Sequence, residues 1–90
     1  MEYEWDERKA GKNYVKHGVP FETVELFEWD TALVVFDADH SAIEERWIAL
    51  GLVQGRLHVL IYTERDRRVR VISLRKANAV EKKFYAEKTL

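Results

Sequence analysis

The sequence predicts an α+β fold in the order ααββββα, with two N-terminal helices, a four-stranded antiparallel sheet and a C-terminal helix. Apolar residues change from helical spacing to strand-like alternation near residue 32, and they return to helical spacing near residue 78. Two short turn sequences, Gln54-Gly55 and Asp66-Arg67, separate apolar runs and favour antiparallel hairpins. The chain has 90 residues, of which 47% are hydrophobic, so we expect one domain over residues 1–90.

The first helix is predicted over about residues 6–17. Asp6 is suited to cap its start, and Gly18 is suited to the left-handed residue that ends a helix. The residues at helical spacing on its apolar side are Ala10, Tyr14 and His17. Pro20 favours the first turn of a second, short helix that ends near Glu28. The apolar face of this second helix consists of Phe21, Val24 and Phe27.

Four strands follow in the prediction, at about residues 32–36, 44–52, 56–65 and 69–76. Asn78 then begins the last helix, with Glu81 as its capping-box partner. We expect Val80 and Phe84 to form the apolar stripe of that helix. The expected core contains Phe21, Val24, Phe27, Val34, Ile48, Val59, Ile61, Ile72 and Phe84.

Charge is distributed unevenly along the chain. Residues 1–45 contain twelve Asp and Glu against four Lys and Arg, whereas residues 46–90 contain eleven Lys and Arg against four acids. Basic residues alternate with β-branched ones over residues 65–76, a pattern that favours contact with a polyanion such as nucleic acid. The chain has no cysteine, no apolar run near the roughly 20 residues that a membrane helix needs, and an acidic start. We therefore expect a cytoplasmic protein with no membrane partner.

The arginines are more informative as a group than singly. In strand geometry Ser73 and Arg75 share one face, and Ile72 and Leu74 share the other. Because Ile72 and Leu74 are bulky and apolar, we expect them to face the helices and expect Ser73 and Arg75 to lie on the open face. Arg46 and Arg65 belong to neighbouring strands and reach the same face. This pattern indicates either a salt-bridged sheet surface or an active site.

The chain has three histidines, each of which is a candidate functional group. His17 lies at a predicted helix C-terminus, where the helix dipole favours an imidazolium, and it is interpreted either as a proton donor or phosphate ligand or as a capping residue. Asp37, Asp39 and His40 resemble metal ligands, but with no second cluster at ligand spacing the turn interpretation is favoured. His58 alternates into an apolar strand and is expected to be packed or at the surface. We predict no metal site.

A longer pattern covers almost the whole chain. It consists, in order, of Tyr3-Glu4-Trp5-Asp6, Lys9-Ala10, Asn13, Lys16-His17-Gly18-Val19, Phe21-Glu22, Asp39-His40, Glu45-Arg46-Trp47, Leu50-Gly51, Thr63-Glu64-Arg65, Arg70-Val71-Ile72-Ser73, Arg75-Lys76-Ala77, Glu81 and Tyr85. With these segments the chain resembles the BrnT toxin family of type II toxin–antitoxin modules. The resemblance implies a RelE-like fold, a small antiparallel sheet with helices on one face. It also implies a ribonuclease that arrests translation and is neutralised by a BrnA antitoxin, whose ribbon-helix-helix portion binds operator DNA.

The resemblance also implies a chemistry. RelE-like toxins cut RNA without a metal or other cofactor by directing the 2′-hydroxyl at the adjacent phosphate, which needs a base, an acid and donors for the extra negative charge. The residues expected to stabilise that charge are Arg75, Arg46 and, third, Arg65. His17, Lys16 or Glu64 would move protons, with base and acid left unassigned, and Tyr85 would reach the edge of the cleft. The residues expected to bind RNA are Lys16, Arg70, Ser73 and Lys76.

Two other functions stay open from the sequence. One is a catalytically silent subunit that binds the antitoxin in a repressor complex, and the other is a nucleic-acid binder that does not cleave. We expect the chain to be a monomer alone and a hetero-oligomer with the antitoxin, and to reach operator DNA only through the antitoxin. We also expect the antitoxin to cover an exposed apolar patch that uses Trp29 or Trp47.

Overall fold

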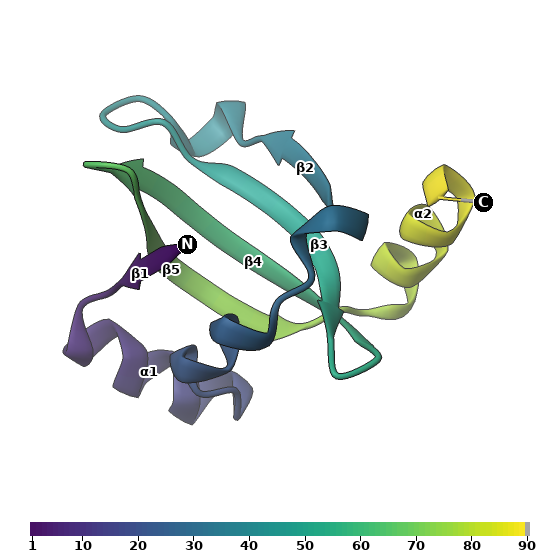
Figure 1. Cartoon of the computed structure of the whole chain (residues 1–90), viewed down its shortest axis with the longest axis horizontal. Helices are drawn as coiled ribbons and strands as arrows, with labels where there is room; N and C mark the ends of the chain where they lie inside the picture. The colour runs from purple at the N-terminus through teal and green to yellow at the C-terminus, as the bar shows by residue number, and fades with distance from the viewer. Residues whose placement is uncertain (90) are drawn as a thin grey trace.

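The computed structural model describes residues 1–89 and has an α+β fold, as predicted (Figure 1). Five strands form one sheet in the order β1-β5-β4-β3-β2. The strands are β1 (Glu2–Glu4), β2 (Leu33–Phe36), β3 (Trp47–Val53), β4 (Arg56–Arg65) and β5 (Arg68–Lys76). The α-helices are α1 (Glu7–His17) and α2 (Ala79–Thr89), and three 3-10 segments are η1 (Phe21–Leu26), η2 (Trp29–Thr31) and η3 (Ala38–His40).

The predicted four-stranded antiparallel sheet is wrong, because a strand precedes the first helix. β1 pairs with β5 in parallel, with Glu2 opposite Arg68 and Glu4 opposite Arg70, so the sheet is mixed. Two things hold this strand in place. The hydroxyl of Tyr3 accepts a hydrogen bond from the Trp29 indole at 2.7 Å, and Glu4 forms ion pairs with arginines of β5. The strand has only three residues, too few for an alternating pattern to be recognised.

The second predicted helix is also wrong in type. Residues 21–26 form a 3-10 helix, in which the amide of Thr23 donates to the carbonyl of Pro20 and the amide of Phe27 to that of Val24. Its predicted apolar face is confirmed, because Phe21 and Val24 are completely buried. Two β-branched residues lie among these six, and they disfavour a longer regular helix.

Local signals at the ends of elements are confirmed. Asp6 accepts hydrogen bonds from the amides of Arg8 and Lys9, and Gly18 ends α1 with a φ of 70°. Both predicted hairpin turns are present, with positive φ at the two central residues of each: Gln54, Gly55, Asp66 and Arg67. β3 begins at Trp47 rather than at residue 44, because residues 44–46 form a loop whose Glu45 carbonyl accepts a hydrogen bond from Thr63.

The resemblance implied helices on one face of the sheet, but in the structure the helices lie on both faces. One face packs against α1 and η1, and its core contains Phe21, Val24, Phe27, Ala49, Leu60, Tyr62, Val71 and Leu74. The alternate residues of the same strands, Leu50, Leu57 and Val59, form a smaller cluster with Tyr85 of α2. The predicted α2 stripe is wrong, because Val80 and Phe84 are 77% and 43% exposed. Val34 is also exposed, since β2 is an edge strand.

A β-bulge changes the predicted faces of β5. Ser73 pairs with Ile61 and Val71 pairs with Tyr62, so Ile72 is an extra residue without a partner on β4. Leu74 therefore shares the α1 face with Val71 instead of with Ile72. Ser73 and Arg75 lie on the opposite face, which α2 covers only in part. Within residues 1–89, none of the helices has the length and hydropathy needed to cross a membrane.

Candidate functional site

Most of the predicted site residues fall into two groups at opposite ends of β5. The first, here called the α1 cluster, consists of the predicted residues Lys16, His17, Ser73 and Arg75 together with Lys9 and Lys12 of α1. Apart from Arg75, these residues line a shallow hollow of about 240 Å³ between α1 and β5, together with Asn13 and Ile72. The three lysines repeat at helical spacing and so share one face of α1. Among the residues described, none of these lysines has an ion-pair partner.

Asn13 fixes α1 against β5 at this hollow. Its amide nitrogen donates to the carbonyls of Val19 and Leu74, at 3.1 and 2.8 Å, and its oxygen accepts from the Leu74 amide at 3.3 Å. The Ser73 hydroxyl is 3.4 Å from the same oxygen. Asn13 is buried, so these bonds replace the ones that the backbone of β5 would otherwise make beyond the end of β1. Asn13 thereby sets the position of His17, one helical turn further along α1.

His17 is half-buried at the end of α1. Burial lowers its pKa, and the nearby positive charges of Lys16 and Arg75 lower it further. The expected preference for an imidazolium at the helix C-terminus is therefore wrong, because burial and two cations oppose the helix dipole. Near pH 7 the imidazole is neutral and has one nitrogen available to accept a proton.

Arg75 is held by the first turn of α2. Its Nη1 and Nη2 atoms donate to the two carboxylate oxygens of Glu81, at 2.8 and 2.7 Å, and this contact raises the pKa of Arg75. Glu81 also accepts from the amide of Asn78, whose side chain accepts from the Glu81 amide, so the predicted capping box is confirmed. A guanidinium has five N–H donors, and within residues 1–89 the Nε–H and one Nη2–H have no acceptor. Arg75 is thus fixed in orientation with a second pair of donors available.

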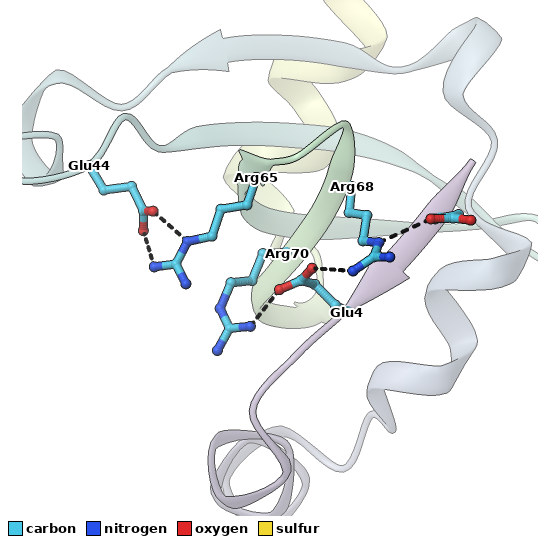
Figure 2. A network of polar contacts seen from close by, with 6 residues as sticks. Glu4, Glu44, Arg65, Arg68 and Arg70 are labelled. Carbon is cyan, nitrogen blue, oxygen red and sulfur yellow. Dashed lines mark hydrogen bonds and ion pairs between the residues drawn. The ribbon is translucent and has the colours of Figure 1, made fainter.

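The second group lies at the other end of β5 and is here called the Glu44 cluster: Arg46, Arg65, Arg68 and Arg70 with Glu2, Glu4 and Glu44. Arg65 donates to Glu44 through Nε and Nη2, at 2.7 and 3.1 Å (Figure 2). Glu4 lies between Arg70, at 2.7 Å, and Arg68, at 3.8 Å, and Glu2 accepts from Arg68. These contacts fit the salt-bridged surface that the sequence left open. The bond from Arg65 lowers the pKa of Glu44, and the charges of Arg70 and Arg46 lower it further.

Arg46 lies in the loop before β3. Its amide donates to the hydroxyl of Ser41 and its carbonyl accepts from the amide of Asp37. Its guanidinium has no ion pair in the part of the chain that the structure describes. Asp37 is buried and contacts His40 at 3.1 Å, so this pair holds the loop together. Residues 1–89 contain no group of three side chains suited to bind a metal.

Three predicted residues lie outside both groups. Glu64 is exposed on the α1 face of β4. Tyr85, on α2, packs against the sheet, and its hydroxyl donates to the carbonyl of Thr31 at 2.7 Å. Lys76 lies beyond Leu74 on the α1 face of β5, opposite His58. The predicted apolar patch also differs, because Trp29 and Trp47 are half-buried while Val34, Val35, Phe36 and Ile43 are exposed.

Sequence reasoning missed two positioning residues. Asn13 gave no signal beyond its place in the family pattern, because its partners are backbone groups far along the chain. Glu81 was recognised as a capping residue but not as the partner of Arg75. Its spacing of six residues from Arg75, across a strand end and a helix start, was a usable signal.

Comparison with known proteins identifies the family of the chain. No curated protein matches the chain. A sequence model of one family, described as the ribonuclease toxin BrnT of type II toxin–antitoxin systems, matches residues 5–81. The match covers most of the chain, including all of α1 and all of the strands β2 to β5. The chain therefore belongs to the BrnT family of ribonuclease toxins, and as a member of a type II module it has an antitoxin partner.

Proposed function

We propose that this chain is an endoribonuclease that cleaves RNA at the α1 cluster by attack of the 2′-hydroxyl on the adjacent phosphate, without a metal ion. The observation that carries the proposal is the hollow between α1 and β5, where His17 lies beside Lys16 and Ser73. Arg75 lies two residues beyond Ser73 on the same face of β5, and its charge contributes to the lowered pKa of His17. A base and a fixed guanidinium are the two groups that this reaction needs most. Membership of a ribonuclease toxin family supports the reaction class.

Each group has a defined role in the proposed step. His17 accepts the proton of the 2′-hydroxyl, the oxygen forms a bond to phosphorus, and the bond from phosphorus to the 5′-oxygen breaks. The products are a 2′,3′-cyclic phosphate and a 5′-hydroxyl, and the proton that the 5′-oxygen needs comes from the Lys16 ammonium. Arg75 donates its second pair of N–H groups to the phosphate as negative charge develops. The Ser73 hydroxyl lies beside these groups and contacts the RNA backbone.

The Glu44 cluster binds RNA on one side of the cut in this proposal. Arg70 and Arg75 are five residues apart on one strand, roughly 15 Å, so they contact different phosphates. Arg46 and Arg65 belong to the same cluster as Arg70 and extend the path away from the cut, and Lys76 extends it at the other end. Glu64 and Tyr85 take no step, since Glu64 lies at the end of β4 far from Arg75 and the Tyr85 hydroxyl is bonded to Thr31.

The biological role follows from the reaction. We propose that cleavage of RNA in the cytoplasm arrests translation and that a BrnA-type antitoxin with a ribbon-helix-helix portion neutralises the chain. The chain alone is a monomer in this proposal, and it reaches operator DNA only through the antitoxin. The exposed apolar residues of β2, Val34, Val35 and Phe36, support a protein partner at that sheet edge.

Single-turnover incubation of the purified chain with RNA tests the reaction. We expect cleavage in excess chelator, a 2′,3′-cyclic end, and resistance of RNA with a 2′-deoxy sugar at the cut. The rate should rise with pH through a value below 6.5 and then stay level, because His17 must be deprotonated and its pKa is lowered. His17→Gln should remove this pH dependence. Absence of cleavage by folded protein would favour a silent antitoxin-binding subunit or a non-cleaving binder.

Expression in a bacterial host tests the role. Induction of the chain alone should stop growth, and co-expression of the neighbouring antitoxin gene should restore it. Normal growth with confirmed expression of folded protein would contradict the proposed arrest of translation.

A further inference from the structure

A second cavity lies next to the α1 cluster, and of its lining residues only Lys76 has a role in the proposed function. It has a volume of about 350 Å³ and is formed by the loop after α1, the β3–β4 hairpin and the end of β5. This volume is at the lower end of the range for small-molecule sites, roughly 300–1,000 Å³. Gly18 and Lys76 both line it; Gly18 directly follows His17 in the sequence, whereas Lys76 follows Arg75 but lies on the other face of β5. The cavity therefore adjoins His17, the proposed base.

The lining of the cavity is both apolar and polar. Its apolar residues include Pro20, which is exposed, and Val19 and Val53, which are only 3% and 5% exposed. His58 also lines the cavity and is only 6% exposed. Its Nδ1 lies 2.8 Å from the carbonyl oxygen of Arg56, and a carbonyl only accepts, so Nδ1 carries the proton. In the neutral imidazole Nε2 is then a hydrogen-bond acceptor.

The acceptor of His58 opens into the cavity. Within residues 1–89, every buried side-chain nitrogen or oxygen has a hydrogen-bond partner. Nε2 of His58 has no hydrogen-bond partner among these residues, so it is not buried. Because His58 lines the cavity, Nε2 is accessible from it. Gln54 adds an amide with both donors and an acceptor, held at the rim by a turn with a φ of 50°. Arg56 and Lys76 add positive charge, and neither has an ion pair in the described part of the chain.

We propose that this cavity binds the base of an RNA nucleotide next to the cut phosphate, and this inference rests on the proposed function. A nucleobase has flat apolar faces that contact exposed Pro20 and the small accessible parts of Val19 and Val53, and an edge with N–H donors that fits Nε2 of His58. Gln54 contacts the same edge and contributes to base preference. Arg56 and Lys76 bind the phosphate of that nucleotide. The cavity is thus a specificity subsite rather than a second reaction centre.

Nuclear magnetic resonance titration tests the subsite without any cleavage. The probes are the four nucleoside 3′-monophosphates, with ribose 5-phosphate and inorganic phosphate as comparison ligands. We expect amide shifts at Gly18, Val19, residues 53–58 and Lys76, with at least one base bound more tightly than ribose 5-phosphate. Equal shifts and equal affinity with inorganic phosphate would overturn base binding, as would no shift with any nucleotide at millimolar concentration.

Two variants and one control sharpen this test. His58→Phe removes the acceptor, and Gln54→Asn shortens the amide while keeping a residue that tolerates positive φ. Each should weaken nucleotide binding about three- to tenfold, the effect of one lost hydrogen bond. Arg67→Gln, in the turn of the other hairpin, should leave affinity unchanged. If His58→Phe fails to fold, Gln54→Asn alone decides, since Gln54 is exposed; an affinity equal to wild type would contradict the subsite.

The inference and the proposed function fail in different ways. If the chain binds nucleotides at this cavity but does not cleave RNA, the subsite stands and the reaction is wrong. If it cleaves RNA and Gln54→Asn changes neither nucleotide affinity nor the preferred cleavage sequence, the reaction stands and the subsite is wrong.

Discussion

The two cationic clusters at the ends of β5 differ in what their charges contact. In the Glu44 cluster, Arg65, Arg68 and Arg70 each form an ion pair with a glutamate from the first half of the chain (Figure 2). In the α1 cluster the three lysines have no such partner among the described residues, and the one paired arginine, Arg75, is held by local Glu81. The uneven charge of the sequence is therefore cancelled in space at one end of β5 and retained at the other.

This difference separates two uses of the same residue types. Exposed ion pairs contribute little to stability and exchange readily, so the Glu44 cluster is a surface that phosphate can share only by displacing a carboxylate. The α1 cluster has positive charge that no carboxylate has to vacate, beside a neutral imidazole. A reaction centre is expected at the α1 cluster and a binding surface at the Glu44 cluster.

The largest expected effect separates Arg75 from Arg46, which the sequence ranked together. If Arg75 stabilises the reacting phosphate, Arg75→Ala should lower the single-turnover cleavage rate about 10²- to 10³-fold, the usual loss for one oriented charge donor. Arg75→Lys should recover only part of this, because lysine lacks the paired donors. Arg46→Ala should weaken RNA binding and leave the rate at saturating enzyme within about tenfold, since Arg46 lies in the Glu44 cluster.

Glu81→Gln is the matched control for Arg75→Ala, because it removes the same ion pair but keeps the guanidinium. A loss in Glu81→Gln as large as in Arg75→Ala would mean that the ion pair, not the charge on the phosphate, is what Arg75 supplies. A loss confined to Arg46→Ala would place the reaction centre in the Glu44 cluster.

Asn13 provides the next largest effect, on stability. Asn13→Ala leaves the carbonyls of Val19 and Leu74 and the Leu74 amide without their buried partner, at a cost of about 2–3 kcal/mol in the free energy of unfolding. Urea denaturation measures this cost. Asn13→Asp keeps the acceptor for the Leu74 amide but loses both donated bonds, so it should also destabilise the protein. Cleavage by either variant should fall while RNA affinity at high enzyme concentration changes less, because Asn13 positions His17 and does not contact RNA. Wild-type stability in Asn13→Ala would contradict the role given to this residue.

Much of the local structure could be predicted because its causes are local. The bounds of β4, both hairpin turns, the Asp6 cap and the Asn78 capping box depend on residues within a few positions of each other. β1 depends instead on pairing with residues 66 positions away, and its three residues have no period. The bulge did leave a signal that the alternating interpretation missed: the apolar residues Val69, Val71 and Leu74 step by two and then by three.

The site was predicted less well, for the same reason. The arginines of β5 were recognised from their alternation with apolar residues, but the glutamates that bind them come from β1 and from the loop before β3. Sequence alone therefore left the choice between a salt-bridged surface and an active site open. The structure divides the residues between the two interpretations: Arg65, Arg68 and Arg70 fit the first, and the α1 cluster has the composition of the second.

A smaller effect is expected from Glu81 and acid. The bond from Arg75 lowers the pKa of Glu81, so its contribution to stability is present above the unfolded pKa near 4.5 and is lost as pH falls through the lower folded value. Wild type should exceed Glu81→Gln in unfolding free energy by about 1–2 kcal/mol at pH 7, and the two should converge well below pH 4. Urea denaturation at both pH values measures the difference. A gap that is the same in acid would show that the cap, and not the charge, stabilises α2.

The smallest effect compares the two clusters directly through salt. Each phosphate contact changes the slope of log affinity against log salt concentration by about 0.7 for a single strand. Lys16→Ala removes a contact, so the slope should become shallower by about that amount. Glu44→Gln frees the Nε and Nη2 donors of Arg65 for phosphate, so the slope should become steeper and the affinity for RNA should rise by less than about tenfold.

The measurement uses RNA with 2′-O-methyl sugars, which the proposed reaction does not cut. Glu22→Gln is the control: it removes the same charge from an exposed residue of η1 and should raise the affinity for RNA less. Equal slopes in Glu44→Gln and Glu22→Gln would mean that Glu44 acts only through net charge, and that the ion pairs of its cluster do not compete with RNA.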